Sequence, residues 1–281
     1  MKDIDTLVKD IEGVLEGNGG WNATVAAHFD QAVNTLMDVR LNPSGEARKG
    51  TLRMSNVGQP CGRKLWYHVN NEPGENLRAS TRLKFLYGDL IEEVVLSLAE
   101  AAGHDVQGRQ DRMELAGIVG HRDGVIDGML VDVKSASTFG FKKFKEHELR
   151  KEDPFGYLMQ LSSYLLASRD DPLVTNKREA AFLVMDKQHG HLVLDKYDLT
   201  HEMATLESMI ERRKKMVKDA IPPARGYTDK AFQKSGNRQL GIECSYCEYK
   251  HSCWPGLRTF LYSRGPVFLT EVNKEPDVKE V

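Results

Sequence analysis

Apolar residues recur at helical spacing in several long stretches of this chain. The clearest stretch covers residues 81–102, and Gly103 stands where a helix would end. Its buried face would carry Leu83, Leu86, Tyr87, Leu90, Ile91, Val94, Val95 and Leu98. Similar patterns occupy residues 154–169 and about 199–219, and residues 1–50 show two weaker ones. The pattern therefore predicts a helical N-terminal segment and three long helices.

Other stretches alternate apolar and polar residues, as half-buried β-strands do. Residues 104–115 and 118–127 alternate in this way, and residues 130–135 complete a three-strand meander. Residues 179–186 and 191–197 read as a hairpin around a glycine-containing turn. The chain therefore contains strands as well as long helices.

Composition narrows the class of protein. The chain has 281 residues and a formal net charge of -2, so no overall basic field indicates nucleic acid, although local patches remain an alternative. No apolar run reaches the length that spans a membrane, and the N-terminus lacks a signal-peptide pattern. We therefore expect a cytoplasmic location and no membrane partner.

Residues 120–134 bring acidic residues and a lysine together. An Asp-Gly pair at 127–128 marks a tight turn between two short strands, so Asp127 is a turn residue. Asp123 lies before the turn, and Asp132 and Lys134 share a face after it. Two close carboxylates repel each other unless a cation such as Mg²⁺ or Mn²⁺ lies between them. The alternative is an exposed strand edge with a solvated ion pair.

Two of the predicted helices carry polar residues that this site would use. Glu92 lies one turn beyond Gly88 and is a third acidic ligand if that helix face packs on the two strands. Otherwise Glu92 is a solvated glutamate, as we expect of its neighbour Glu93. Gln160 and Tyr164 are four residues apart and share a helix face, which is also an ordinary polar surface.

Basic and aromatic residues alternate in two places. Arg63, Lys64, Trp66 and Tyr67 form the first group, and residues 141–145 (FKKFK) form the second. Such residues neutralise phosphates and stack on bases. The alternative for both is an amphipathic helix with a solvated basic face.

The four cysteines are spaced like metal or cluster ligands. Three follow the pattern C-x2-C-x5-C and the fourth is far upstream: Cys244, Cys247, Cys253 and Cys61. Four thiolates suit either tetrahedral Zn²⁺ or a [4Fe–4S] cluster. The one-plus-three arrangement and the nearby Pro255 favour the cluster, whereas His251 as a substitute ligand keeps zinc open. Either centre would join the two ends of the chain and act mainly on stability.

Taken together, these motifs resemble the PD-(D/E)xK nuclease superfamily, in particular its RecB-like branch with an iron–sulfur cluster. That branch includes CRISPR adaptation nucleases, AddB-type nuclease domains and phage exonucleases. The resemblance spans roughly residues 50–256. Its four nuclease motifs match Gly88-Asp-Leu-Ile-Glu92, Gly120-His-Arg-Asp123, Asp132-Val-Lys134 and Gln160-Leu-Ser-Ser-Tyr164. The chain departs from the pattern at Glu92, where many members have histidine.

The resemblance implies an α/β, restriction-endonuclease-like core: a central mixed β-sheet flanked by helices, with a helical Fe–S-bearing part. It implies an N-terminal helical segment (1–50), the nuclease domain (51–256) and a C-terminal tail (257–281). The implied ligands of Mg²⁺ or Mn²⁺ are Glu92, Asp123, Asp132 and the carbonyl of Val133. Lys134 would orient or help deprotonate a water, and Gln160 and Tyr164 would position the phosphate backbone.

The implied activity is a metal-dependent exonuclease that degrades single-stranded DNA from its ends. Recombination, repair or phage DNA processing in a bacterial or phage-infected cell would be its setting, with a helicase or recombinase as a partner. Trp66, Tyr67 and Phe144 are the candidates for base stacking. The alternatives are a non-catalytic nucleic-acid-binding subunit with a structural metal site and a zinc-bearing interaction module.

Overall fold

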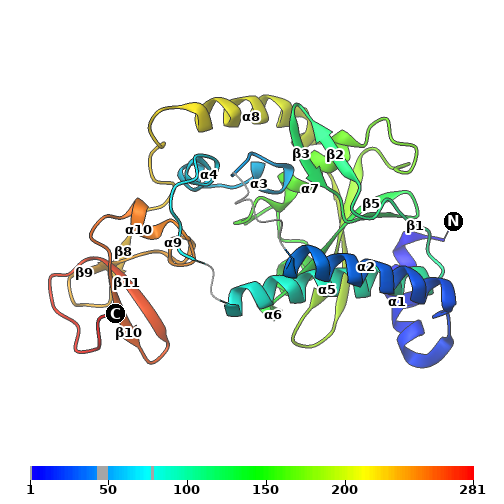
Figure 1. Cartoon of the computed structure of the whole chain (residues 1–281), viewed down its shortest axis with the longest axis horizontal. Coiled ribbons are helices and arrows are strands. Elements are labelled where there is room, and N and C mark those ends of the chain that lie inside the picture. Colours follow the sequence, from blue (N-terminus) through cyan, green and yellow to red (C-terminus); the bar gives the residue numbers. More distant parts are fainter. Residues whose placement is uncertain (1, 43–49, 77–78) are drawn as a thin grey trace. The chain divides into compact units, whose positions relative to one another are not determined.

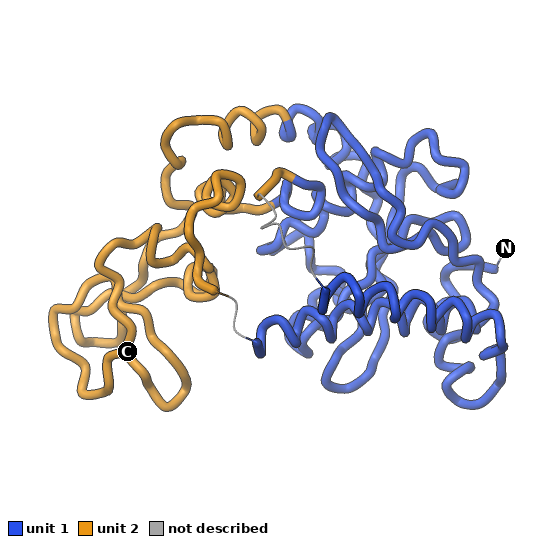
Figure 2. Tube along the Cα trace, in the orientation of Figure 1, with its two compact units in different colours: residues 1–47, 53–58, 78–210 blue, residues 48–52, 59–77, 211–281 orange. Residues whose placement is uncertain are grey.

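The chain forms two compact units, which are described separately (Figure 2). The computed structural model describes all residues except 1, 43–49 and 77–78. Unit 1 comprises Met1–Ala47, Arg53–Gly58 and Arg78–Ile210, and unit 2 comprises Arg48–Leu52, Gln59–Leu77 and Glu211–Val281. Along the described ranges, every helix is too short or too polar to cross a bilayer.

The long helices of unit 1 lie where the periodicity predicts them (Figure 1). The helices of this unit are η1 (Ile4–Thr6), α1 (Leu7–Gly13), η2 (Val14–Asn18), α2 (Ala23–Leu41), α3 (Met54–Val57), α5 (Ala79–Ala101), α6 (Thr138–Lys145), α7 (Tyr157–Ala167) and the first half of α8 (Thr200–Lys218). The buried face predicted for α5 is partly wrong, because Leu83, Tyr87 and Val94 are exposed. Asn22 begins α2, because its side chain accepts hydrogen bonds from the N–H groups of Thr24 and Val25. Residues 43–49 of the predicted N-terminal segment lie outside the described residues.

A five-stranded mixed sheet is the centre of unit 1. Its strands, in spatial order, are β1 (Val106–Gln107), β4 (Gly124–Ile126), β5 (Met129–Ala136), β6 (Glu179–Asp186) and β7 (Leu192–Asp198). β5 and β6 are parallel, and the other neighbouring pairs are antiparallel. A separate hairpin joins β2 (Arg112–Leu115) to β3 (Ile118–His121). The predicted hairpins β4–β5 and β6–β7 are confirmed. The predicted three-strand meander is wrong in its strands: residues 104–115 form β1 and β2, residues 118–127 form β3 and β4, and β2 and β3 lie outside the five-stranded sheet.

Helices cover both faces of this sheet. On one face α1 and α5 pack on the strands, with α2 beside α5, and their shared core contains Leu7, Ile11, Ile91, Val95, Leu96, Ala99, Ile126, Met129, Val131, Val133, Ala181 and Leu183. The alternate residues of these strands point to the other face of the sheet, where α6 and α7 pack. Phe182 of β6 accordingly contacts Phe144 and Tyr157. A central mixed sheet with flanking helices is thus confirmed, and it is consistent with a restriction-endonuclease-like fold.

Unit 2 has its own small sheet. Its elements are α4 (Gly62–Val69), β8 (Lys230–Phe232), β9 (Asn237–Gln239), α9 (Ile242–Ser245), α10 (Lys250–Cys253), β10 (Arg258–Tyr262) and β11 (Gly265–Glu271). The strand order is β10-β11-β9-β8, around the buried Phe232, Phe260 and Leu269. Residues 257–281 therefore differ from the tail predicted there: two strands of this sheet form within them because Phe260 and Leu269 are buried in its core.

Candidate active site

The β4–β5 hairpin places Asp123 beside Asp132. Its turn lies at Asp127 (φ 49°) and Gly128 (φ 80°), as the Asp-Gly pair predicts. The antiparallel ladder ends with Gly124 opposite Val131, so the next step puts Asp123 opposite Asp132. Directly opposed residues in such a ladder point to the same face of the sheet. The two carboxylates therefore converge where β4 begins.

Val133 connects the two strands beyond the last ladder pair. Its N–H donates to Asp123 Oδ2 at 2.7 Å. Because the N–H and C=O of one strand residue point to the same side, the Val133 carbonyl also points toward the segment that carries Asp123. The Val133 side chain packs in the core under α5, on the opposite face from Asp132. A carbonyl oxygen is thereby presented next to two carboxylates.

Lys134 and Gln160 both contact Asp132. Lys134 Nζ forms an ion pair with Asp132 Oδ2, and Gln160 Nε2 of α7 donates to Asp132 Oδ1 at 3.3 Å. The Lys134 ammonium also lies 5.3 Å from the ring centroid of Tyr157, in the first turn of the same helix. Burial alone would lower the pKa of Lys134, but the carboxylates of Asp132 and Asp123 raise it above its usual value.

Glu92 completes the acidic group from α5. Burial, followed by the charges of Glu93 and Asp132, raises the pKa of Glu92 to about 7, and Gln110 Nε2 donates to its Oε1 at 2.6 Å. Burial and the charges of Asp132 and Glu92 likewise raise the pKa of Asp123 well above its usual range. The three carboxylates therefore disfavour one another's charge, which a cation between them would relieve.

Tyr164 of α7 lies near enough to Asp132 and Asp123 to be affected by their charges. It is buried, and burial with the charges of Asp132 and Asp123 raises the pKa of its phenol. A β-carbon added at Gly120 would lie 2.7 Å from Tyr164 Cε1 and 2.8 Å from its hydroxyl. Gly120 is therefore needed so that β3 can approach the Tyr164 ring. By contrast, a β-carbon at Gly88 would meet Ser135 Oγ at an ordinary 3.4 Å, so no such need exists there.

Two polar residues around the site, Gln110 and Arg122, have no role in the sequence prediction, and a third, Glu93, differs from it. Gln110, in the turn before β2, holds Glu92, as described above. Arg122, between two motif residues, is 1% exposed and pairs with Asp111 at 2.7 Å and Asp171 at 2.5 Å. Glu93 is buried, and Arg109 lies 3.9 Å away, so the solvated glutamate expected there is wrong. The position of Arg122 inside a strand motif could have indicated that this charged residue is buried and paired. No local feature of the sequence indicated that Gln110 contacts Glu92.

The chemistry of these donors fits a hard divalent cation. Asp132 is 2% exposed, and its Oδ2 accepts no hydrogen bond although it contacts the Lys134 ammonium. Carboxylate and carbonyl oxygens are the ligands that Mg²⁺ and Mn²⁺ prefer. Within the described ranges, no three His, Cys, Asp or Glu side chains are arranged closely enough to hold a metal ion. The donor types are thus appropriate, but their arrangement is not a closed metal site.

The four cysteines all belong to unit 2. Cys61 precedes α4, Cys244 lies in α9, Cys247 follows it and Cys253 ends α10. Burial and the charges of the other three thiols raise the pKa of Cys244 to about 11. A β-carbon at Gly226 would lie 3.1 Å from Cys61 Sγ, so the chain passes close to that thiol. Four thiols are the donor set of a cluster or of zinc, but within the residues that the structure describes no three of these side chains lie close enough together to hold a metal.

Other residues proposed from the sequence have different surroundings. His251 Nε2 pairs with Glu75 Oε1 at 3.1 Å. Tyr67 is 5% exposed and packs on Tyr249, and Phe144 is 5% exposed and packs on Phe182, so the prediction that these two rings stack on bases is wrong. Both rings are packed in the apolar interior because each lies on the inner face of an amphipathic helix. Trp66 is half-buried, and its Nε1 donates to the Asp219 carbonyl at 2.9 Å.

Comparison with known families identifies the class of protein. A sequence model of the PD-(D/E)XK nuclease superfamily matches residues 27–254. The chain belongs to this superfamily. A search of curated proteins finds no match. Among solved structures, one titled "Crystal structure of SSO0001" is similar with a TM-score of 0.43 and 14% sequence identity, covering 80% of this chain and 95% of that chain.

Proposed function

We propose that this chain is a Mg²⁺- or Mn²⁺-dependent deoxyribonuclease that degrades single-stranded DNA from an end. One observation carries the proposal: the β4–β5 register places Asp123 beside Asp132, and Lys134 forms an ion pair with Asp132. The charge of Glu92, on α5, also raises the pKa of Asp123. Membership of the PD-(D/E)XK nuclease superfamily supports the reaction class. Exonuclease action and the preference for single strands go beyond that class.

Each residue has a defined part in this proposal. Glu92, Asp123, Asp132 and the Val133 carbonyl would hold the ion. Such an ion supplies an activated water and neutralises charge on the scissile phosphate. Lys134, which the neighbouring carboxylates keep as an ammonium, orients the water and stabilises the charge that develops on the phosphate oxygens.

Gln160 and Tyr164 act on the same centre from α7. The Gln160 amide fixes the orientation of Asp132 through the 3.3 Å hydrogen bond. Tyr164 is buried, so it supports Gln160, which lies one turn earlier on the same helix face. In this proposal the two residues position the carboxylate and, through it, the phosphate backbone.

The cysteines form a second centre in the proposal. We assign Cys61, Cys244, Cys247 and Cys253 to a [4Fe–4S] cluster with a structural role. The mutual effect of the thiols on the pKa of Cys244 and the one-plus-three spacing support this assignment. A cluster whose irons are saturated by thiolates offers no open position for water, so it would take no part in phosphodiester hydrolysis.

The biological setting follows from the proposed substrate. Single-stranded DNA ends arise in recombination, repair and phage DNA processing, and a helicase or recombinase that exposes such ends would be a natural partner. Closed circular strands offer no end, so an exonuclease should leave them intact.

The test uses end-labelled linear and closed circular single strands, each with Mg²⁺, Mn²⁺ or EDTA. We expect linear strands to be shortened from an end only when metal is present. Asp132→Asn, Asp123→Asn and Lys134→Ala should abolish cleavage while DNA binding largely survives, because contacts to phosphates elsewhere carry binding. Asp170→Asn is the matched control, since the side chain of Asp170 is 94% exposed.

Three outcomes distinguish the alternatives. Rapid nicking of closed circles would make the protein an endonuclease. Metal-independent binding without cleavage would favour a non-catalytic nucleic-acid-binding subunit. Cleavage that persists in Asp132→Asn protein would indicate a contaminating nuclease and contradict the proposed site.

A further inference from the structure

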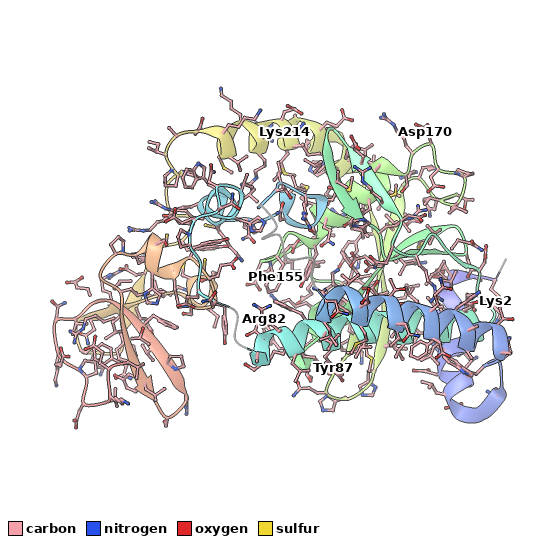
Figure 3. All side chains as sticks on the ribbon, viewed as in Figure 1. Lys2, Arg82, Tyr87, Phe155, Asp170 and Lys214 are labelled. Atoms are coloured by element: carbon pink, nitrogen blue, oxygen red, sulfur yellow. The ribbon has the colours of Figure 1, made fainter. Side chains whose placement is uncertain are left out.

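Phe155 is an exposed ring at the entrance to α7. Its side chain is 62% exposed and lies on the loop that leads into this helix (Figure 3). Single exposed apolar residues are ordinary on protein surfaces. Phe155 differs because its ring stacks on Tyr157, with centroids 5.2 Å apart and planes 30° apart. One ring is therefore supported from behind, and more than half of its residue surface is open.

The stacked rings of Phe155 and Tyr157 lie close to the proposed catalytic centre. The Tyr157 ring lies 5.3 Å from Lys134 Nζ, and Lys134 pairs with Asp132. The Tyr157 ring therefore lies next to both the open ring of Phe155 and the Lys134 ammonium. A nucleotide whose base stacks on Phe155 would have its sugar and phosphate close to Lys134.

The loop that carries Phe155 is held in place by hydrogen bonds and close packing. Asp153 Oδ1 accepts hydrogen bonds from the N–H groups of Gly156 at 2.8 Å and Tyr157 at 2.9 Å, and its Oδ2 accepts one from Leu158 at 2.9 Å. Gly156 has a φ of 75°, and a β-carbon there would lie 2.2 Å from the Gly58 carbonyl oxygen. The loop is thus fixed on both sides of Phe155, so little conformational freedom would be lost when a base binds.

The inner rings hold Tyr157 in place. Its centroid lies 6.2 Å from Phe144 and 6.2 Å from Phe182, and both of those residues are buried. The aromatic packing that removes Phe144 from contact with solvent thereby supports the two rings nearer the surface. A base–aromatic contact requires an open ring face, which Phe155 offers and Phe144 does not.

We propose that Phe155, supported by Tyr157, stacks on an unpaired nucleobase next to the phosphate that is cleaved. This inference rests on the proposed nuclease function and names the residue that selects unpaired nucleotides. A base within a duplex is covered by its neighbours on both faces, so the interior of a duplex offers no free face to the ring. Phe155 is thus a specificity residue for single strands and frayed ends.

The first test measures binding and does not depend on cleavage. Asp132→Asn protein, with and without Phe155→Ala, is titrated with a single-stranded oligonucleotide that carries 2-aminopurine near one end. We expect Phe155→Ala to weaken binding by about tenfold, in the range of one base–aromatic stack, and to abolish the change in 2-aminopurine fluorescence. Phe155→Trp should retain both, and thermal melting of each variant checks folding.

The second test separates stacking from a structural role. One abasic nucleotide is moved along the oligonucleotide, and KM and kcat are measured for the enzyme with intact Asp132. We expect one position at which the abasic substrate raises KM for the unmodified protein but not for Phe155→Ala. Trp21→Ala is the matched control, because Trp21 is 47% exposed and its ring packs on Phe29 instead.

The outcomes of the two inferences are distinguishable. Phe155→Ala protein that binds single strands as tightly as its parent, or that loses no more than Trp21→Ala protein, would overturn the stacking proposal and leave the nuclease proposal intact. If cleavage is absent but the binding loss and fluorescence change are observed, the nuclease proposal fails and the stacking site remains. An equal loss on intact duplex and single strand would also overturn the role in strand selection.

Discussion

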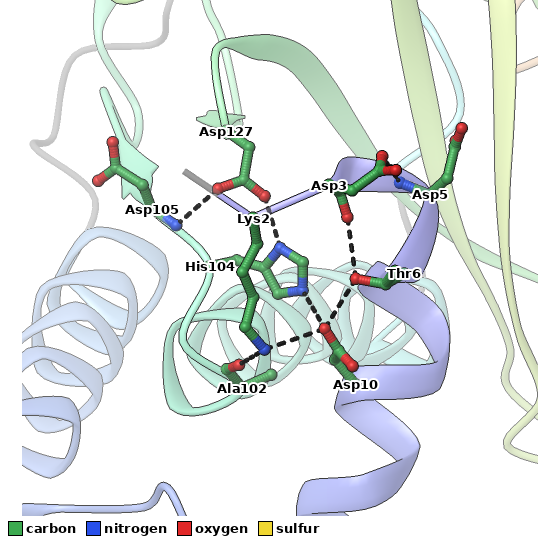
Figure 4. A network of polar contacts seen from close by, with 9 residues as sticks. All are labelled: Lys2, Asp3, Asp5, Thr6, Asp10, Ala102, His104, Asp105 and Asp127. Carbon is green, nitrogen blue, oxygen red and sulfur yellow. Dashed lines mark hydrogen bonds and ion pairs between the residues drawn. The ribbon is translucent and has the colours of Figure 1, made fainter.

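Asp123 and Asp127 are four residues apart, yet their carboxylates have different surroundings. Asp123 accepts a hydrogen bond from Val133 N–H, beside Asp132. Asp127 Oδ2 lies 2.5 Å from Nδ1 of the buried His104, whose Nε2 lies 3.2 Å from Asp10 Oδ2 (Figure 4). The first carboxylate belongs to the candidate site, and the second ties the β4–β5 turn to α1.

This difference predicts opposite effects of two substitutions. Asp127→Ala would leave His104 Nδ1 and the N–H of Asp105 without their partner, which costs about 1–3 kcal/mol of the free energy of unfolding for a buried group. Cleavage should survive. Asp123→Asn should abolish cleavage with a smaller loss of stability. Urea unfolding and the end-label assay measure both quantities, and a loss of cleavage only in Asp127→Ala would contradict the proposed site.

A pair of glycines tests the packing beneath the site. Gly120→Ala would place a β-carbon 2.9 Å from Met54 Cβ as well as against the Tyr164 ring. Such overpacking costs about 1–3 kcal/mol, and displacement of Tyr164 should also lower kcat through Gln160. Chemical unfolding and single-turnover cleavage measure the two effects.

Gly88→Ala is the matched control for this prediction. Its added carbon has room, and alanine is better than glycine inside a helix by up to about 1 kcal/mol. We therefore expect equal or higher stability and unchanged cleavage. Equal destabilisation by both substitutions would contradict the account of why Gly120 is glycine.

At the scale of elements, local patterns predicted most of unit 1 and little of unit 2. The helices at 79–101 and 200–218 have long periodic faces, and the Asp-Gly turn fixed the register of β4 and β5. The register then placed Asp123 beside Asp132. By contrast, β8 and β9 have three residues each, too short for a visible alternation. Likewise, Tyr67 and Phe144 read as surface residues because flanking lysines and arginines hid which helix face was buried.

The start of α8 carries a pH-dependent contribution to stability. Asp198 Oδ1 accepts a hydrogen bond from Thr200 N–H at 2.9 Å, and Oδ2 pairs with Arg178 at 2.7 Å. The bonds from Thr200 and the charge of Arg178 lower the pKa of Asp198 to about 2. Because the folded state favours the ionised form, its stabilising effect is full above the unfolded value near 3.8 and is lost as the pH falls through about 2.

Asp198→Asn should therefore lower the free energy of unfolding at pH 7, and its difference from the unmodified protein should shrink as the pH falls from about 4 toward 2. Urea unfolding at a series of pH values measures this difference. Asp170→Asn again serves as the control, and its curve should follow that of the unmodified protein. A difference for Asp198→Asn that grows toward acid pH would show that the sign is wrong.

At the scale of the whole molecule, the two proposed centres belong to different units. Glu92, Asp123, Asp132 and Lys134 lie in unit 1, whereas all four cysteines lie in unit 2. Unit 2 is assembled from segments far apart in the sequence, 48–52, 59–77 and 211–281. No local pattern predicts which distant segments join. The spacing of the cysteines was the one feature of the sequence that indicated a connection between residue 61 and residues 244–253. The same signal left zinc and iron–sulfur as alternatives, because both use four thiolates.

Metal binding by the cysteines should therefore stabilise unit 2 without taking part in cleavage. A bond between Cys61 and the segment 244–253 closes a very long loop of the unfolded chain, and binding that requires the folded site adds to the free energy of folding. Calorimetry of the complete protein, prepared without air, should show a transition that moves to lower temperature when any one of the cysteines is changed to serine. Activity should fall only as far as folding does.

The identity of the metal decides between the two alternatives. Protein prepared without air should be brown and contain about four irons per chain with matching sulfide. Changing Cys61, Cys244, Cys247 or Cys253 to serine should remove the colour, whereas Ser245→Ala, inside the same motif, should keep it, since that hydroxyl donates to the Gly241 carbonyl. Stoichiometric zinc without iron or sulfide would contradict the cluster. It would leave the nuclease proposal standing, because the residues of that site lie in the other unit.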